Sequence, residues 1–343
     1  MRISFRFFLI LFCVSNQYAQ EISGVVIDSH SQQPIEGASI YFDNTTIGTT
    51  SNAQGEFSLS YKTSINTALV VSFLGYEKQQ IKDYKSGKPL KISLKEEVST
   101  LNEVLLYAKD KVPRSDKLDL FRNFFIGTSK NAKSCDILNE NDLVFKLNRA
   151  DSTLIAYSDK PIIIRNKKLE YLINYDLQEF KIKCDIFEMH EKERLYPHAF
   201  YYSGTAFFKD EKESTRSKIL NRRDDAYKGS VLHFMRALLV DSLRTEGYKL
   251  YYNNEEVKPM NFISMYPTEN PTIKKVRFFK PMYIGYSSGK KGENTISSVE
   301  PTDTYFYLNN YGNYFPINAL SFSGFMGYMR MGDALPLDYI PLE

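Results

Sequence analysis

Four residues on either side of a glycine could together bind an anion. Arg223 and Tyr227 are four positions apart and His233 and Arg236 are three apart, so each pair would share one face of a helix. Two cations and a histidine near a helix N-terminus can hold a carboxylate or a sulfate. The alternative is an ion-pair and packing cluster with the neighbouring acids Asp224, Asp225 and Asp241. We expect this packing role, and we keep the four residues as the candidate binding site.

A zinc site is a second chemical possibility. His190 and Glu193 form an H-x-x-E pair, and His233 is available as a distant third ligand. A zinc carboxypeptidase uses such a set to hold the metal while water attacks the peptide. The charged run from Glu188 to Arg194 instead favours a solvated turn. The chain also lacks the alternating helix–strand pattern that this peptidase fold requires. We therefore expect no catalytic residue, no metal and no cofactor, with a zinc-dependent hydrolase as an alternative.

The segment Gly285-Tyr286-Ser287-Ser288-Gly289 matches the G-x-S-x-G pattern. A nucleophile elbow needs a strand before the serine, a helix after it and a histidine downstream. The last histidine, His233, precedes this segment, so we expect a β-turn here. The sequence also contains no H-E-x-x-H pattern, no P-loop and no dinucleotide fingerprint.

Residues 1–20 have the order of regions that is typical of a secretory signal peptide. Met1–Arg6 is basic, Phe7–Val14 is apolar and Ser15–Gln20 is more polar. The apolar run is far shorter than the roughly 20 residues of a spanning helix. We therefore expect an exported protein of the periplasm or outer membrane, with no transmembrane helix after signal cleavage.

Composition limits the remaining classes. The chain has 343 residues with 43% hydrophobic and 25% charged, which excludes disorder across its whole length. Tyr (25) and Phe (24) are abundant and Trp is absent, a bias that favours strands. Removing Arg2 and Arg6 with the signal lowers the net charge from +3 to +1, so no nucleic-acid partner is expected. The length is too small for a 22-stranded transporter barrel.

Cys135 and Cys184 are the two cysteines outside the expected signal. Export would permit a disulfide between them, which would close a loop of about 50 residues worth ~4 kcal/mol. Two separate buried thiols are the alternative, and the sequence leaves both open.

Residues 21–97 read as a small β-sandwich, because short strand candidates are separated by turn signals. The candidates are Ile22–Asp28, Ala38–Phe42, Glu56–Ser60, Ala68–Phe73 and Leu90–Leu94. Five blocks here agree in order and spacing with one known family. They are Gly24–Asp28, Pro34–Ile40, Gly48–Asn52, Gly55–Leu59 and Phe73–Tyr76.

Together these blocks resemble the carboxypeptidase regulatory-like domain, a transthyretin-like β-sandwich. The resemblance implies a non-catalytic module found in proteins of Gram-negative, Bacteroidota-type cell envelopes. Such modules precede TonB-dependent transporters of the starch-utilisation type, so the resemblance also implies a TonB-dependent transporter system as a partner. A carboxypeptidase-type name would derive from this module and would not indicate peptidase chemistry.

Residues 98–117 are expected to be a linker. Leu101–Ala108 resembles the coupling segment between this module and a transporter plug, although a strand or linker is favoured on length grounds. Lys109–Lys117 is rich in charge and should be exposed. Limited proteolysis is therefore expected to cut there first, with Glu211–Arg223 as the main competitor.

Residues 118–343 are expected to form a larger β-rich domain with helices near 211–246. The longest strand candidates are Leu169–Phe187 and Ala199–Phe208, and Val231–Thr245 has the apolar spacing of a helix with Ser230 as its N-cap. Several segments are similar to an uncharacterised region that follows the sandwich in many exported proteins. They include Phe125–Thr128, Asn131–Cys135, Asn221–Arg223, Ala226–Ser230, Gly327–Met331 and Leu335–Tyr339.

Taken together, the sequence predicts a mainly β protein with an N-terminal transthyretin-like sandwich. We expect a non-enzymatic accessory, scaffold or binding protein of the cell envelope. A glycan or peptide receptor, in which tyrosine-rich strands of the second domain form the groove, is a further alternative.

Overall fold

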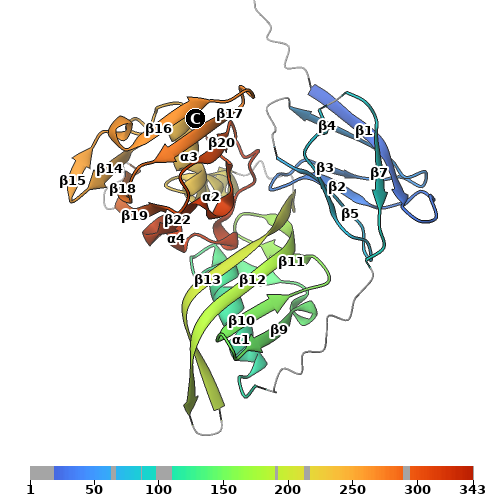
Figure 1. Ribbon diagram of the computed structural model, residues 1–343, viewed down its shortest axis with the longest axis horizontal. Helices are drawn as coiled ribbons and strands as arrows, with labels where there is room; N and C mark the ends of the chain where they lie inside the picture. Colours follow the sequence, from blue (N-terminus) through green and yellow to red (C-terminus); the bar gives the residue numbers. More distant parts are fainter. Residues whose placement is uncertain are drawn as a thin grey trace, which may run out of the picture.

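The protein folds into three groups of strands, each around its own cluster of buried side chains (Figure 1). The structure is a computed structural model that describes residues 19–62, 67–85, 87–97, 110–189, 192–211, 217–288 and 294–342. Residues 1–18 of the expected signal peptide and the Leu101–Ala108 segment lie outside the described residues. The predicted mainly β fold is confirmed.

The N-terminal group is the predicted sandwich of two sheets. One sheet has the order β4–β1–β7, made of Glu56–Lys62, Ala19–Asp28 and Leu90–Leu94. The other has the order β3–β2–β5–β6, made of Gly48–Thr50, Ser39–Phe42, Leu69–Ser72 and Gln79–Ile81. Val26, Phe42 and Leu94 are fully buried between the sheets. Alternation of apolar and polar residues places them on the inner faces.

The central group is built on a long hairpin. Strands β12 (Tyr171–Met189) and β13 (Lys192–Asp210) have 19 residues each and pair antiparallel along their length. On its other edge, β12 pairs with both β11 and β10. Strand β8 then pairs with β11, and β9 pairs with β10. These strands are β8 (Cys135–Ile137), β9 (Val144–Asn148), β10 (Thr153–Tyr157) and β11 (Ile162–Asn166). Helix α1 (Arg114–Phe121) covers the sheet.

Part of the expected linker belongs to this central group. Lys117 lies in α1, where its buried ammonium contacts the carboxylate of Asp110 at 2.6 Å. Val112 is buried in the core, and the backbone N–H of Lys111 donates to Glu193 at 3.0 Å. Within the described part of the Lys109–Lys117 segment, Val112 and Lys117 are thus anchored, while Lys111 and residues 114–116 are exposed as their polar character indicated.

The third group has two sheets and a helix that packs into their shared core. One sheet has the order β15–β14–β18–β19–β22, made of Glu255–Val257, Tyr248–Tyr252, Met282–Ser287, Asn294–Pro301 and Leu320–Ser323. The other has the order β16–β17–β20–β21, made of Ile263–Pro267, Ile273–Phe278, Phe306–Asn309 and Tyr314–Phe315. A short helix, α4 (Gly324–Tyr328), follows β22.

Helices α2 (Ser217–Tyr227) and α3 (Val231–Leu239) lie where the sequence predicted helices. Phe234, Met235 and Leu238 of α3 are buried in the third core. The helix ends at Leu239 instead of Thr245, because Asp241 adopts a left-handed conformation with φ of 55°. Ser242 then caps the turn by donating to the carbonyl of Ala237 at 2.8 Å through its backbone N–H.

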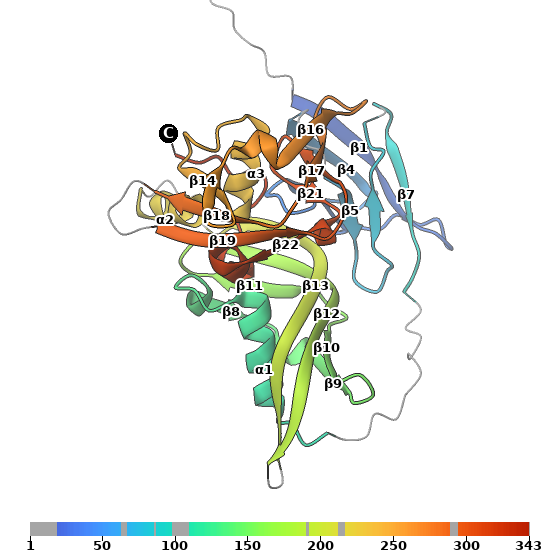
Figure 2. The same ribbon diagram turned by 60° about the vertical axis from the view of Figure 1, so that its left-hand side comes forward.

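The sandwich is docked on the central hairpin (Figure 2). The backbone N–H of Asn44 donates to the carbonyl of Ala206 at 2.7 Å, and the N–H of Phe208 donates to the carbonyl of Thr45 at 3.0 Å. The ring of Phe207 stacks on Tyr41 with centroids 5.0 Å apart. This strand-like pairing continues β13 onto the loop between β2 and β3.

A cluster of ionisable groups lies in the same interface. The hydroxyl of Tyr41 donates to Asp176 at 2.9 Å, and Lys78 forms an ion pair with Asp176 at 2.8 Å. Asp43 accepts a hydrogen bond from the backbone N–H of Ala206 at 2.9 Å. Burial, with a smaller contribution from the charge of Asp176, raises the pKa of Asp43 to about 6. Docking therefore takes a carboxyl group out of water.

The disulfide suggested between Cys135 and Cys184 is not formed, and both residues are buried free thiols. Cys135 in β8 pairs with Asn166 of β11, which pairs with Tyr171 at the start of β12. Cys184 lies thirteen residues further along β12, about 40 Å of strand. A disulfide needs Cα atoms within about 7 Å of each other. The long strand thus separates the two cysteines.

We predict that both thiols stay reduced and react slowly. Burial raises the pKa of Cys135 to about 12 and that of Cys184 to about 11, so neither is a thiolate near neutral pH. Alkylation followed by peptide mass spectrometry should label both cysteines after denaturation without reductant, and label neither quickly in the native protein. Recovery of a peptide pair linked through Cys135 and Cys184 would contradict this.

The Asp43→Asn variant should have a different pH dependence of stability from the wild type. The folded state keeps the Asp43 proton up to about pH 6, whereas the ordinary value is 3.8, so the free energy of unfolding falls as pH rises between these values. The substituted amide cannot ionise, so the variant should gain roughly 1–3 kcal/mol relative to wild type between pH 4 and pH 7. Urea unfolding at both pH values measures this difference. Asp159→Asn, at an exposed position outside the interface, is the control, and an equal change in both variants would refute the assignment.

Candidate functional site

A backbone break between two helices positions the predicted binding residues. Gly229 adopts φ of 76°, and a Cβ atom there would lie 2.8 Å from the ring of Tyr286. Ser230 then caps α3, with its Oγ accepting from the backbone N–H of His233 at 3.1 Å. The glycine thus allows α2 to end and α3 to start within three residues, with α3 packed in the third core.

Arg223 packs against the central hairpin, with partners other than the neighbouring acids that the sequence suggested. Its guanidinium lies 3.7 Å from the centre of the Tyr171 ring and pairs with Asp210 at 2.6 Å. Its Nε also donates to the carbonyl of Leu169 at 2.8 Å. Arg223 therefore joins α2 to the central hairpin, and it does not line the cleft that the other three predicted residues share.

Arg236 also serves the fold. Its Nε donates to the carbonyl of Tyr311 at 2.9 Å, and its two terminal nitrogens donate to the carbonyls of Tyr339 and Leu337 at 3.0 and 2.8 Å. The guanidinium thus holds the segment around Leu337 against α3. These three carbonyls take three of the five N–H donors of the guanidinium.

Tyr227, His233 and Arg236 line one cleft of about 890 Å³ between α2, α3 and the end of β18. The polar and aromatic lining groups include Asp224, Lys228, Thr245, Glu246, Tyr286 and Ser287, and aliphatic residues such as Leu239, Val240 and Leu342 complete the lining. Lys228 and Asp224 form an ion pair at 2.5 Å on the α2 side. Both charge signs and several hydroxyl groups thus face this cleft.

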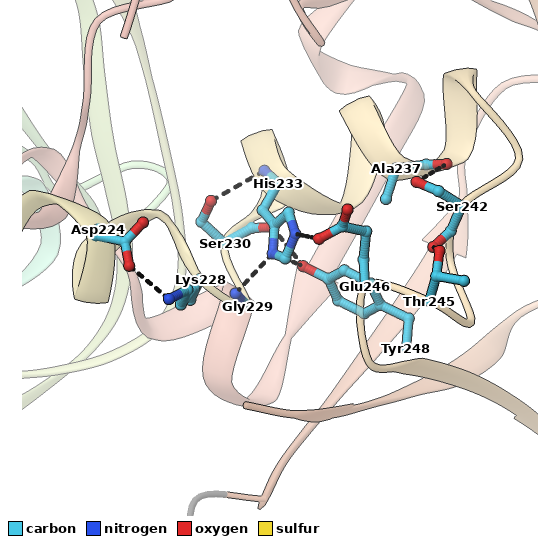
Figure 3. A network of polar contacts seen from close by, with 10 residues as sticks. All are labelled: Asp224, Lys228, Gly229, Ser230, His233, Ala237, Ser242, Thr245, Glu246 and Tyr248. Atoms are coloured by element: carbon cyan, nitrogen blue, oxygen red, sulfur yellow. Dashed lines mark hydrogen bonds and ion pairs between the residues drawn. The ribbon is translucent and has the colours of Figure 1, made fainter. Parts of the chain in front are cut away.

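His233 connects a carboxylate to a buried tyrosine (Figure 3). Its Nε2 lies 3.1 Å from Glu246, and its Nδ1 lies 3.0 Å from the hydroxyl of Tyr248 and 3.2 Å from the backbone nitrogen of Gly229. An amide N–H can only donate, so Nδ1 accepts and Nε2 carries the proton that goes to Glu246. Burial lowers the pKa of His233, which favours this neutral form.

Three tyrosine rings enclose this histidine. The ring centroids of Tyr227, Tyr248 and Tyr286 lie 4.7, 5.0 and 5.6 Å from the centroid of His233. Burial raises the pKa of Tyr248 well above its ordinary value, so this phenol is a donor and not a nucleophile near neutral pH. Both imidazole nitrogens of His233 have protein partners. In the hydrogen-bonded series Tyr248–His233–Glu246, Glu246 is the residue that reaches solvent. The arrangement suits a rigid binding wall better than a proton-transfer centre.

The residues of the zinc hypothesis do not come together where the structure describes them. Glu193 lies near the turn of the β12–β13 hairpin, where it pairs with Arg149, and this hydrogen bond lowers its pKa. That end of the hairpin is far from α3, which holds His233 (Figures 1 and 2). His190 lies outside the described residues. Within the described ranges, no group of three His, Cys, Asp or Glu side chains could hold a metal.

Ser287 does not occupy a nucleophile elbow. It is the last residue of β18 and pairs with Asn294 at the start of the antiparallel strand β19. A strand therefore follows this serine where an elbow needs a helix. Gly289 lies outside the described residues.

Sequence reasoning missed Glu246 and Tyr248, the two partners of His233. Both flank Gly247, which adopts φ of 87°, and the chain turns there from the α3 region into β14. A glycine two residues beyond the predicted helix Val231–Thr245 was the available signal, since residues beside a sharp turn can point back to the preceding helix. The pairing itself depends on tertiary packing.

Comparisons with known proteins concern the N-terminal part of the chain. The model of the CarboxypepD_reg-like domain matches residues 22–106. The TonB-dependent receptor SusC of Bacteroides thetaiotaomicron is 31% identical over 108 residues, and the TonB-dependent receptor P39 of Formosa agariphila is 31% identical over 106 residues. Each match covers 31% of this chain and 10% of the relative, so the chain spans about a tenth of the length of these curated relatives.

Among the described residues, no helix combines the length and the apolar character needed to cross a bilayer. The five sequence blocks and the observed sandwich agree with the family match. Residues 22–106 are therefore a CarboxypepD_reg-like domain, and the chain shares part of its sequence with two TonB-dependent receptors.

Proposed function

We propose that this protein is a non-enzymatic accessory binding protein of the cell envelope that works beside a TonB-dependent transport system. It would be exported through the signal at residues 1–20 and act in the periplasm or at the outer membrane. The family match and the two TonB-dependent receptors support this setting.

Both ring nitrogens of His233 are already hydrogen-bonded within the protein, and this observation carries the proposed binding role. A hydrolytic cleft needs a base with a free lone pair facing the substrate. Here Gly229 and Tyr248 occupy the Nδ1 lone pair, and the Nε2 proton faces Glu246. The cleft can therefore offer hydrogen bonds, charges and aromatic surface to a ligand, but it presents no activated base from this histidine.

The docked sandwich supports a scaffold role. Hydrogen bonds from Asn44 and Phe208, the ring contact of Tyr41 and the ion pair of Lys78 fix the domain on the central hairpin. A partner that binds the sandwich would therefore be held at a set position relative to the cleft. This geometry suits a scaffold that holds a partner of the sandwich near a ligand of the cleft.

A receptor for glycans or peptides is the second candidate function. Exposed tyrosines on the third group favour it, including Tyr266 and Tyr307. Tyrosine rings expose flat apolar surface while their hydroxyl groups remain hydrated, which suits contact with a polar ligand.

Crosslinking in envelope membranes tests the accessory role. Full-length tagged protein, crosslinked in its native host and purified, should yield a TonB-dependent receptor identified by mass spectrometry and enriched over a tagged exported control protein. N-terminal sequencing of the recovered protein should start near Gln20. Recovery from the cytosol with residues 1–19 intact, or no enriched receptor, would contradict the proposal.

The His233→Ala variant separates a structural histidine from a metal ligand. Removing the imidazole leaves the Gly229 N–H without its acceptor and leaves the Tyr248 hydroxyl only the carbonyl of Ser230, at 3.4 Å. The free energy of unfolding should therefore fall by about 2–4 kcal/mol. Zinc or a chelator should not change the wild-type melting temperature. His198→Ala, at an exposed position of β13, should have a small effect and is the matched control. Stoichiometric zinc in unchelated wild-type protein, lost in His233→Ala, would instead support the hydrolase.

A further inference from the structure

The outer face of the β16–β17–β20–β21 sheet carries a row of aromatic and cationic side chains. Tyr266 of β16 is opposite Lys275 of β17, Lys275 is opposite Tyr307 of β20, and Tyr307 is opposite Phe315 of β21. Directly opposed residues of an antiparallel pair project from the same face. The register therefore aligns these four side chains across all four strands of the sheet.

A second set of side chains lies beside this row. Arg277 is two residues from Lys275 on β17, so both cations share the outer face. The ammonium of Lys275 lies 4.0 Å from the ring centre of Tyr305, and the guanidinium of Arg277 lies 4.9 Å from that of Phe279. Cations and rings thus alternate in a continuous patch. Its members are Tyr266, Lys275, Arg277, Phe279, Tyr305, Tyr307 and Phe315.

The core does not require these aromatic rings. The inner face of the same sheet supplies Val276, Phe278, Phe306 and Leu308, all buried in the third core. The outer rings remain in contact with solvent, with exposures of 44% for Tyr266, 44% for Phe279, 36% for Tyr307 and 40% for Phe315. A sheet with one solvated face ordinarily places polar residues there. Contiguous exposed apolar surface of this kind marks an interaction site.

The positive charge of the patch indicates a ligand that carries negative groups. The solvent-accessible outward positions on these four strands include two cations and no carboxylate, as read from Ser264, Tyr266, Ile273, Lys275, Arg277, Tyr307 and Phe315. Asn309 shares their register but is fully buried. Aromatic faces pack against the C–H surfaces of sugar rings, and Lys and Arg pair with carboxylate or sulfate groups. Four adjacent strands span roughly 14 Å, which exceeds the size of one sugar ring.

We propose that this patch binds an acidic polysaccharide, a chain of sugars bearing carboxylate or sulfate groups. The rings stack against the sugars, while Lys275 and Arg277 pair with the anionic groups. The polymer lies across the strands, along the row from Tyr266 to Phe315. This inference depends on the proposed envelope setting, where such polymers are available, and it is independent of the cleft at His233. A single-stranded nucleic acid also stacks on rings, but two cations and a net charge of +1 without Arg2 and Arg6 give it little long-range attraction.

Isothermal titration calorimetry with the full-length mature protein tests the proposal. Probes are polygalacturonate, dextran sulfate, neutral dextran and single-stranded DNA. At least one acidic polysaccharide should bind, with affinity that decreases as salt increases, and neutral dextran should bind at least tenfold more weakly. Lys275→Ala/Arg277→Ala and Tyr266→Ala/Tyr307→Ala should each weaken binding by at least tenfold. All substituted side chains lie outside the buried core, so thermal melting should confirm folded variants.

A matched control removes the same residue types from the other sheet. Lys249→Ala/Tyr283→Ala changes an exposed lysine and an exposed tyrosine on β14 and β18, and it should leave binding unchanged. Absence of binding to both acidic polymers, equal losses in control and patch variants, or tighter binding of DNA through the same residues would each overturn the proposal. Recovery of a TonB-dependent receptor by crosslinking does not depend on these results, so failure of the patch and failure of the accessory role are distinguishable.

Discussion

The pairing of β12 with β13 is the interaction on which the rest of the structure depends. Two strands of 19 residues run side by side, and different stretches of this ladder support different neighbours. β11 pairs near Tyr171 and β10 pairs near Lys181, while the ring of Phe121 from α1 packs 4.7 Å from Phe180. The opposite edge, at Ala206 and Phe208, receives the sandwich. Shear in this ladder would therefore move all of these contacts together.

The third group is attached to the same ladder through arginine and asparagine side chains. Arg223 joins α2 to Tyr171 and Asp210, and Asn166 donates to the carbonyl of Gly332 at 2.9 Å. Asp333 then accepts hydrogen bonds from Ser129 at 2.8 Å and Asn131 at 3.0 Å. The turn at Gly332–Asp333 is thus held by side chains from two separate parts of the central group.

Local sequence patterns predicted much of the fold but little of its assembly. Alternation identified β12 and the sandwich strands, since one face of each is buried. It missed β14, β16, β18 and β19, because tyrosine, serine and asparagine are common in these strands and weaken the two-residue period. Helical spacing paired His233 with Arg236, and both line the cleft, but it also paired Tyr227 with Arg223, which does not line it. The partners of these residues, including Glu246 and the carbonyl of Tyr339, are set by tertiary contacts that no short window contains.

One late segment of the sequence has a kinetic consequence. Leu337 donates to the carbonyl of Asn44 at 2.7 Å, and Asp338 accepts from the backbone of Thr46 at 2.9 Å across a separation of 292 residues. At 5–20 residues per second, a ribosome needs about 15 to 60 s to make that stretch. During this interval the loop at Asn44–Thr46 has no native partner for these groups. A chaperone or another chain therefore has that long to occupy these groups of the loop before Leu337 and Asp338 reach them.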